Sequence, residues 1–139
     1  DRACIRLSGA EIVLGGDLGG FAFEYMTAGV AVVLGDPGRW ICSGMSGGMV
    51  FVRVDPARGI DADGIRLRLA KGAKVHIGAP RDTELPALRD LLAGYRRALL
   101  GSGQDAVAHA VRSIADDAAV AFLAIRPGGE VVDQTVSTE

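Results

Sequence analysis

The stretch that decides the fold reads MTAGVAVV over residues 26–33, and related copies lie 19 residues before and after it. The earlier copy is LSGAEIVL (residues 7–14), and the later copy is MSGGMVFV (residues 45–52). Each copy joins small residues to an apolar run, and a turn containing an aspartate follows each run. A fixed period of this length indicates a solenoid, in which each unit buries its apolar face by stacking on a neighbour.

The apolar runs predict strands, because they are short, rich in β-branched residues and separated by glycine and Asp-Pro turns. A 19-residue unit would form one closed coil, with the next coil about 4.8 Å above it. We therefore predict that equivalent side chains stack in columns. The columns are Val13, Val32 and Phe51 in the interior, Leu14, Val33 and Val52 on the opposite face, the hydroxyls of Ser8, Thr27 and Ser46, and the set Cys4, Phe23 and Cys42.

The repeat fades after Arg58. Residues 64–69 and 73–77 still alternate like strands, and we expect them to form a degenerate last coil or a cover for the open end. At the other end, Asp1 enters the pattern without a capping element, which a solenoid normally needs. The chain is therefore expected to be a fragment, or to have that end covered by something else, since uncapped strand edges invite pairing.

The second half of the chain has a helical pattern. A helix is expected from Glu84 and Leu85, capped by Asp82 or Thr83, with Arg96 and Arg97 near its end where they suit the helix dipole. Residues 101–103 form a turn, a second helix covers residues 105–115, and a strand covers residues 118–125 until Pro127 stops it. The predicted organisation is a β-helix over residues 1–80, a helical hairpin and closing strand over 81–127, and a polar tail over 128–139.

Composition limits the classes of function. The net charge is −2, which argues against a general attraction to nucleic acid. Hydrophobic residues make up 49% of the 139 residues, enough for the core of one domain. No apolar stretch of about 20 residues predicts a membrane span. Two cysteines without a signal peptide favour a reducing, cytoplasmic location.

Some residue groups resemble chemical sites. The glycines of residues 15–20 look like a phosphate-binding loop, but such a loop needs a helix after it, and the same turn recurs at residues 35–38. Cys4 and Cys42 lack metal-ligand spacing and, about 10 Å apart on alternate coils, are too distant for a disulfide. We interpret them as buried packing residues.

The remaining polar and aromatic candidates are isolated. His76 and His109 have no nearby nucleophile. Glu24, beside Tyr25, is expected to be an exposed polar spot or a contact to a partner. Further expectations concern repeated positions: Arg39 and Arg58 pair with Asp36 and Asp55 between coils, and Trp40 packs like Phe21. No catalytic, cofactor-binding or metal-binding residue is predicted.

Three segments carry a family resemblance. They are EYMTAGVAVVLG (residues 24–35), the Gly38-Arg39 pair after it, and SGMSGGMVFV (residues 43–52). These segments closely resemble the C-terminal domain of the glutamate synthase large subunit, with its repeated glycine motifs. Residues 88–92, 101–102 and 122–127 are similar to the helical part of that domain. The resemblance covers roughly residues 3–127 and implies a right-handed single-stranded β-helix with a C-terminal helical appendage.

The resemblance implies a structural role. In that family, glutamine hydrolysis belongs to a cysteine amidotransferase domain, and reduction belongs to an FMN barrel with an iron–sulfur cluster. This chain would then be a non-catalytic domain or split subunit of a glutamate-synthase-type oxidoreductase in glutamate biosynthesis, itself without cofactor. FMN and the iron–sulfur cluster would lie on partner domains or subunits, which residues 44–48 and the first coil would contact. Association of the chain with copies of itself, as a homo-oligomer, is a further alternative.

Two alternatives remain. The first is a component similar to a related subunit of formylmethanofuran dehydrogenase, in a formyltransferase–hydrolase complex with a pterin- or molybdenum-linked partner. The second is a binding module that uses its glycine turns for an anion.

Overall fold

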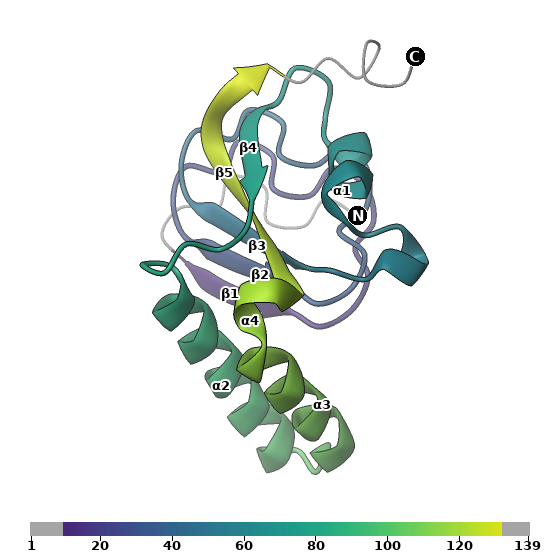
Figure 1. Cartoon of the computed structure of the whole chain (residues 1–139), viewed down its shortest axis with the longest axis vertical. Helices are drawn as coiled ribbons and strands as arrows, with labels where there is room; N and C mark the ends of the chain where they lie inside the picture. Colours follow the sequence, from purple (N-terminus) through teal and green to yellow (C-terminus); the bar gives the residue numbers. More distant parts are fainter. Residues whose placement is uncertain (1–9, 132–139) are drawn as a thin grey trace.

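The computed structural model describes residues 10–131 (Figure 1). These residues form a single five-stranded sheet with the strand order β1-β2-β3-β5-β4. The strands are β1 (Glu11–Leu14), β2 (Val30–Val33), β3 (Met49–Arg53), β4 (Lys74–Gly78) and β5 (Phe122–Val131). The helices are α1 (Ala62–Arg68), α2 (Leu85–Gly101), α3 (Asp105–Asp116) and α4 (Ala118–Ala121), with a 3-10 turn η1 at Pro56–Arg58.

The first three strands are parallel, and the 19-residue spacing sets their register. Val13 lies opposite Val32, and Val32 lies opposite Phe51. Leu14, Val33 and Val52 align in the same way. Both predicted columns of apolar residues are therefore confirmed as neighbours in the sheet.

The two faces of the sheet belong to different parts of the core. Val32 and Phe51 pack with buried leucines of α2, whereas Val33 and Val52 pack with Ile65 of α1 and with the loops. The alternation follows from the two-residue period of a strand. Because both faces are covered, the strands read as continuous apolar runs. The column of Val13, Val32 and Phe51 therefore faces the helices rather than the interior enclosed by the loops.

The predicted right-handed β-helix is wrong as a fold class. The described residues form a small mixed α/β domain around an open sheet. After the third repeat no fourth parallel strand follows, because residues 62–68 form α1. The edge of β3 is instead occupied by β5, which runs antiparallel to it and pairs antiparallel with β4 on its other side. In Figure 1, β5 and β4 run steeply down the view, whereas β1, β2 and β3 run obliquely across it.

The helix α1 replaces the strand expected at residues 64–69. Asp61 accepts a hydrogen bond from the Gly64 amide at 2.7 Å and thereby caps the helix. Ile65 and Leu69, four residues apart, are both buried. An apolar pair at this spacing is compatible with a helix, and the Asp61 cap decides between the two structures. The strand expected at residues 73–77 is confirmed as β4.

The helix pair α2 and α3 lies where the sequence predicts helices, and Figure 1 shows the pair extending from one side of the sheet. The predicted cap is wrong, because the N-cap position of α2 is Glu84, which forms no side-chain cap bond. Arg96 and Arg97 also lie before the last turn, since α2 continues to Gly101. The turn at residues 101–103 is confirmed, with Gly103 at a φ of 81°.

The closing strand differs from its prediction at both ends. Residues expected to begin it form α4, and β5 then runs from Phe122 through Pro127 to Val131. Proline removes a backbone donor, so it is tolerated in a sheet mainly at edges or irregularities. Pro127 lies opposite Val75, where the register with β4 shifts between Lys74 and Val75. That irregularity allows the strand to pass the proline.

The corners between strands repeat an uncommon backbone conformation. Phe21 and Trp40 have φ values of 65° and 62°, and Phe23 and Cys42 have values of 61° and 64°. Each pair is separated by 19 residues. Hydrogen bonds join successive corners, as from the Phe21 amide to the Arg39 carbonyl at 2.8 Å. Non-glycine residues rarely adopt positive φ, so the stacking of one corner on the next maintains it.

Candidate functional site

The glycine cluster of residues 15–20 forms a stacked corner. The Leu18 amide donates to the Asp36 carbonyl at 2.8 Å, which joins this turn to the equivalent turn of the next repeat. A Cβ added to Gly15 would collide with the Tyr95 hydroxyl of α2, so protein atoms occupy the space next to that glycine. Residues 21–25 form turns rather than a helix. The geometry therefore lacks the helix N-terminus of a dinucleotide loop.

Aspartate and arginine side chains connect the turns of the three repeats. Asp17 accepts a hydrogen bond from the Asp36 amide and another from Arg58, both at 2.8 Å. Asp36 pairs with Arg68, whose Nε and Nη2 donate to its two oxygens at 3.0 and 3.1 Å. The hydrogen bonds from these arginines lower the pKa values of Asp17 and Asp36. Pairing between repeats was expected, but the partners differ, since Arg58 reaches Asp17 and Asp36 takes Arg68.

The cysteine and histidine candidates do not come together. Cys42 is free and fully buried, and burial raises the pKa of its thiol to about 12. Cys4 lies outside the described residues, as does Ser8. His76 is exposed on β4, and His109 is exposed on α3. Within residues 10–131, no group of three or more His, Cys, Asp and Glu side chains is placed to hold a metal ion.

Glu24 and the corner aromatics depart from their predictions. Glu24 is only 8% exposed, so it is part of the interior rather than an exposed polar spot. Trp40 is 46% exposed and Phe21 is 42% exposed, and Tyr25 is exposed as well. Trp40 therefore shares the backbone conformation of Phe21, as the repeat indicates, but neither is a fully packed core residue.

A buried ion pair joins the start of α2 to β5, and sequence reasoning missed it. Arg126 donates from Nη2 and Nε to the two oxygens of Glu84, at 2.6 and 2.8 Å. The side chains are only 10% and 11% exposed. Glu84 also accepts from the Arg81 amide at 2.7 Å, and Arg126 donates to the Ala79 carbonyl at 2.9 Å. The paired guanidinium lowers the pKa of Glu84, and the carboxylate raises that of Arg126.

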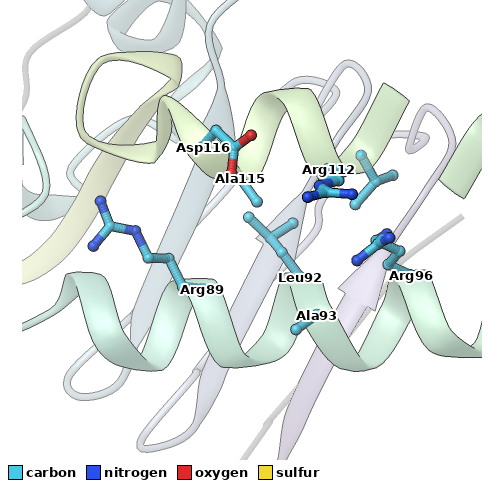
Figure 2. Close-up of a pocket in the computed structure, with 8 residues that line it drawn as sticks. Arg89, Leu92, Ala93, Arg96, Arg112, Ala115 and Asp116 are labelled. Atoms are coloured by element: carbon cyan, nitrogen blue, oxygen red, sulfur yellow. The ribbon is translucent and has the colours of Figure 1, made fainter. Parts of the chain in front are cut away.

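A pocket of about 360 Å³ opens between α2 and α3 (Figure 2). Leu92 and Ala93 of α2 line it together with Val111 and Ala115 of α3. Its charged residues are Arg89, Arg96, Arg112 and Asp116. The sequence pattern predicts an interaction of Arg96 with the helix dipole and no particular role for Arg89. Their spacing of seven residues, on either side of Leu92, could have placed both on one helix face.

A family model described as "GXGXG motif" matches residues 1–111, which is most of the chain. The chain belongs to the GXGXG motif family. Among curated relatives, the glutamate synthase (NADPH) large chain of Bacillus subtilis (strain 168) is 41% identical over 58 residues. That stretch covers 42% of this GXGXG chain but 4% of the relative. The resemblance to the GXGXG domain of glutamate synthase is thereby confirmed.

The family match contains all three repeats and most of the helix pair, and it ends within α3. Strand β5, which occupies the edge of β3, lies beyond the matched residues. The GXGXG match therefore includes the Asp–Arg connections between repeats, whereas only the Glu84 half of the buried ion pair falls inside it. Among residues 10–131, no helix is long and apolar enough to cross a bilayer.

Proposed function

We propose that this GXGXG chain is a non-catalytic structural domain or subunit of a glutamate-synthase-type oxidoreductase. Glutamine hydrolysis and glutamate formation would be carried out by other domains or subunits, which would hold the FMN and the iron–sulfur cluster. The observation that carries the proposal is the GXGXG match over residues 1–111, together with the glutamate synthase relative. Because the chain aligns with only 4% of that relative, the activity of the whole enzyme enters here as part of the proposal.

The chemistry of the described side chains supports a role without turnover. A nucleophilic thiol acts as its thiolate, and the raised pKa of about 12 keeps Cys42 protonated near neutral pH. Cys42 is also 0% exposed, so a substrate would not reach it. His76 and His109 lie on separate elements, β4 and α3, with their side chains exposed.

The connections between repeats support a role as a rigid spacer. Every strand-to-strand step in β1, β2 and β3 keeps one register. The Asp17–Arg58 pair joins two turns 41 residues apart in the chain, and the Asp36–Arg68 pair joins a turn to α1 across 32 residues. A domain whose repeats are joined by both backbone and side-chain contacts would be rigid, and it would therefore hold two partner domains at a fixed separation.

The first test is activity of the isolated chain. Purified protein should hydrolyse no glutamine and should form no glutamate from 2-oxoglutarate with NADPH and an ammonia source. A positive control is an intact glutamate synthase under the same conditions. Robust turnover by the pure chain, abolished by substitution of one of its own residues, would contradict the non-catalytic role.

The second test is the identity of the native complex. The chain, tagged at its chromosomal position, should co-purify with subunits that contain FMN and iron, measured by flavin fluorescence and elemental analysis. Glutamine-dependent glutamate formation by the same fraction would support the proposal. Recovery with a molybdenum–pterin protein would overturn it and would favour the formylmethanofuran-type alternative.

A further inference from the structure

The pocket between α2 and α3 has an excess of positive charge. Three arginines and one aspartate line it, namely Arg89 and Arg96 from α2 and Arg112 and Asp116 from α3. Like charges close together repel, so three guanidinium groups around one pocket favour an anionic occupant.

Among the described residues, the arginines of this pocket form no ion pair, although Asp116 belongs to the same lining. None of the three guanidinium groups forms an ion pair or hydrogen bond with any part of the chain between residues 10 and 131. The Nε atom of Arg96 is moreover buried without an acceptor. A buried donor without a partner costs free energy, so an acceptor supplied from outside the chain would be stabilising at this position.

The remainder of the lining is apolar. Leu92 and Val111 are buried at the contact between the two helices, and Ala93 and Ala115 complete the surface. The volume of about 360 Å³ falls within the range of about 300–1,000 Å³ that is typical of small-molecule sites. A ligand that fits both features has an acidic group for the arginines and a short apolar body for the alanine and leucine side chains.

We propose that this pocket binds a small organic anion whose carboxylate or phosphate group lies between Arg96 and Arg112. In the view of Figure 2, these two arginines lie toward one end of the pocket, and Arg89 and Asp116 lie toward the other. An anionic group at the first end would accept from both helices and would satisfy the buried Nε of Arg96. At the other end the charges of Arg89 and Asp116 offset each other, so the excess positive charge lies between Arg96 and Arg112 and favours ligands with a single acidic head.

Isothermal titration of the full chain with defined probes tests this assignment. The probes are butyl phosphate and pentanoate, which join an acidic head to a short apolar body, with inorganic phosphate as the head alone and butanol as the body alone. We expect saturable binding of at least one of the first two, weaker binding of phosphate, and none of butanol. Comparison of butyl phosphate with pentanoate distinguishes a phosphate from a carboxylate ligand.

Three single substitutions locate the binding. Arg96→Gln and Arg112→Gln should each weaken binding by at least about tenfold, because each removes a charge-assisted hydrogen bond. Arg97→Gln is the matched control, since Arg97 is exposed on the same helix outside the pocket lining and its loss changes the net charge equally. Its affinity should stay within about twofold of the wild type. Arg112 is exposed, so its variant decides the question if the Arg96 variant does not fold.

Three outcomes would overturn the proposal. They are no saturable binding of either amphiphilic anion, equal weakening by Arg97→Gln and Arg112→Gln, and binding of an oligoglutamate peptide without binding of either small anion. The last outcome would indicate contact with an acidic protein segment instead.

Discussion

At the scale of single residues, the Glu84–Arg126 pair is a buried ion pair in which each charge requires its partner. Both side chains are nearly buried, and the Glu84 carboxylate accepts hydrogen bonds from the Arg81 amide and from two nitrogens of Arg126. Removing one partner from such a pair leaves the other charge buried without compensation, which costs more than the intact pair contributes.

Glu84→Gln should therefore lower the free energy of unfolding by about 3 kcal/mol, measured by urea denaturation at neutral pH. The matched control is Asp63→Asn, which breaks the exposed pair with Arg66, whose side chains are 93% and 50% exposed. The control should change stability by less than about 0.5 kcal/mol. Equal changes in the free energy of unfolding for the two substitutions would show that the buried pair contributes no more to stability than the exposed pair.

The same residue gives the protein a defined response to acid. Arg126 holds the pKa of Glu84 below its ordinary value of 4.5. The stabilisation is therefore present above that value and is lost as pH falls through the lowered pKa of the folded state. The stability difference between wild type and Glu84→Gln should be largest at pH 7 and should shrink as the pH is lowered below about 4.5. Urea denaturation at a series of pH values measures it, and a constant difference would contradict the assignment.

At the scale of elements, the stacking of corners depends on close approach of two backbones. A Cβ on Gly47 would collide with the Thr27 carbonyl in the neighbouring repeat. Side-chain atoms forced into packed structure usually cost about 1–3 kcal/mol.

Gly47→Ala should therefore destabilise the protein by about 2 kcal/mol, with loss of amide protection in β2 and β3 measured by hydrogen exchange. Gly101→Ala is the control, because nothing lies within 4 Å of the added Cβ at that helical position. The control should be neutral or slightly stabilising, since alanine favours a helix over glycine. A neutral Gly47→Ala variant would contradict the close approach.

The elements differ in how far local sequence determines them. The parallel register could be read from the chain, because side chains that stack directly require an identical spacing in each repeat. Residues 64–69 could not be assigned in the same way, since a six-residue apolar pattern suits a strand or a helix until the Asp61 cap is taken into account. The pocket and the Glu84–Arg126 pair arise between elements. Arg126 lies 42 residues from Glu84, and no local pattern marks a contact at that distance.

At the scale of the whole molecule, β5 determines the fold class. It is the only described strand that pairs with both β3 and β4, and it lies directly beside the last of the three repeats. Neither its position beside β3 nor its antiparallel direction could be predicted, because pairing between strands about 70 residues apart depends on tertiary packing.

A chain ending at Ala121 should consequently lose cooperative unfolding and should associate into larger species, because the apolar edge of β3 would be left unpaired. Size-exclusion chromatography with light scattering measures the association, and circular dichroism measures the unfolding. The control is the full chain carrying Val120→Ala, which alters a side chain that is 77% exposed and should leave both properties unchanged. A monomeric, cooperatively folded truncation would show that β3 does not need its antiparallel neighbour.

Because β5 pairs with β3, further repeats could extend the parallel part of the sheet on one side only. Duplication of one 19-residue unit would preserve which side chains face which layer, whereas a one-residue shift in the pairing register would turn them over. Since β5 already blocks further addition next to β3, new units would have to enter on the amino-terminal side of that strand. Each added unit would lengthen the parallel part of the sheet by one strand.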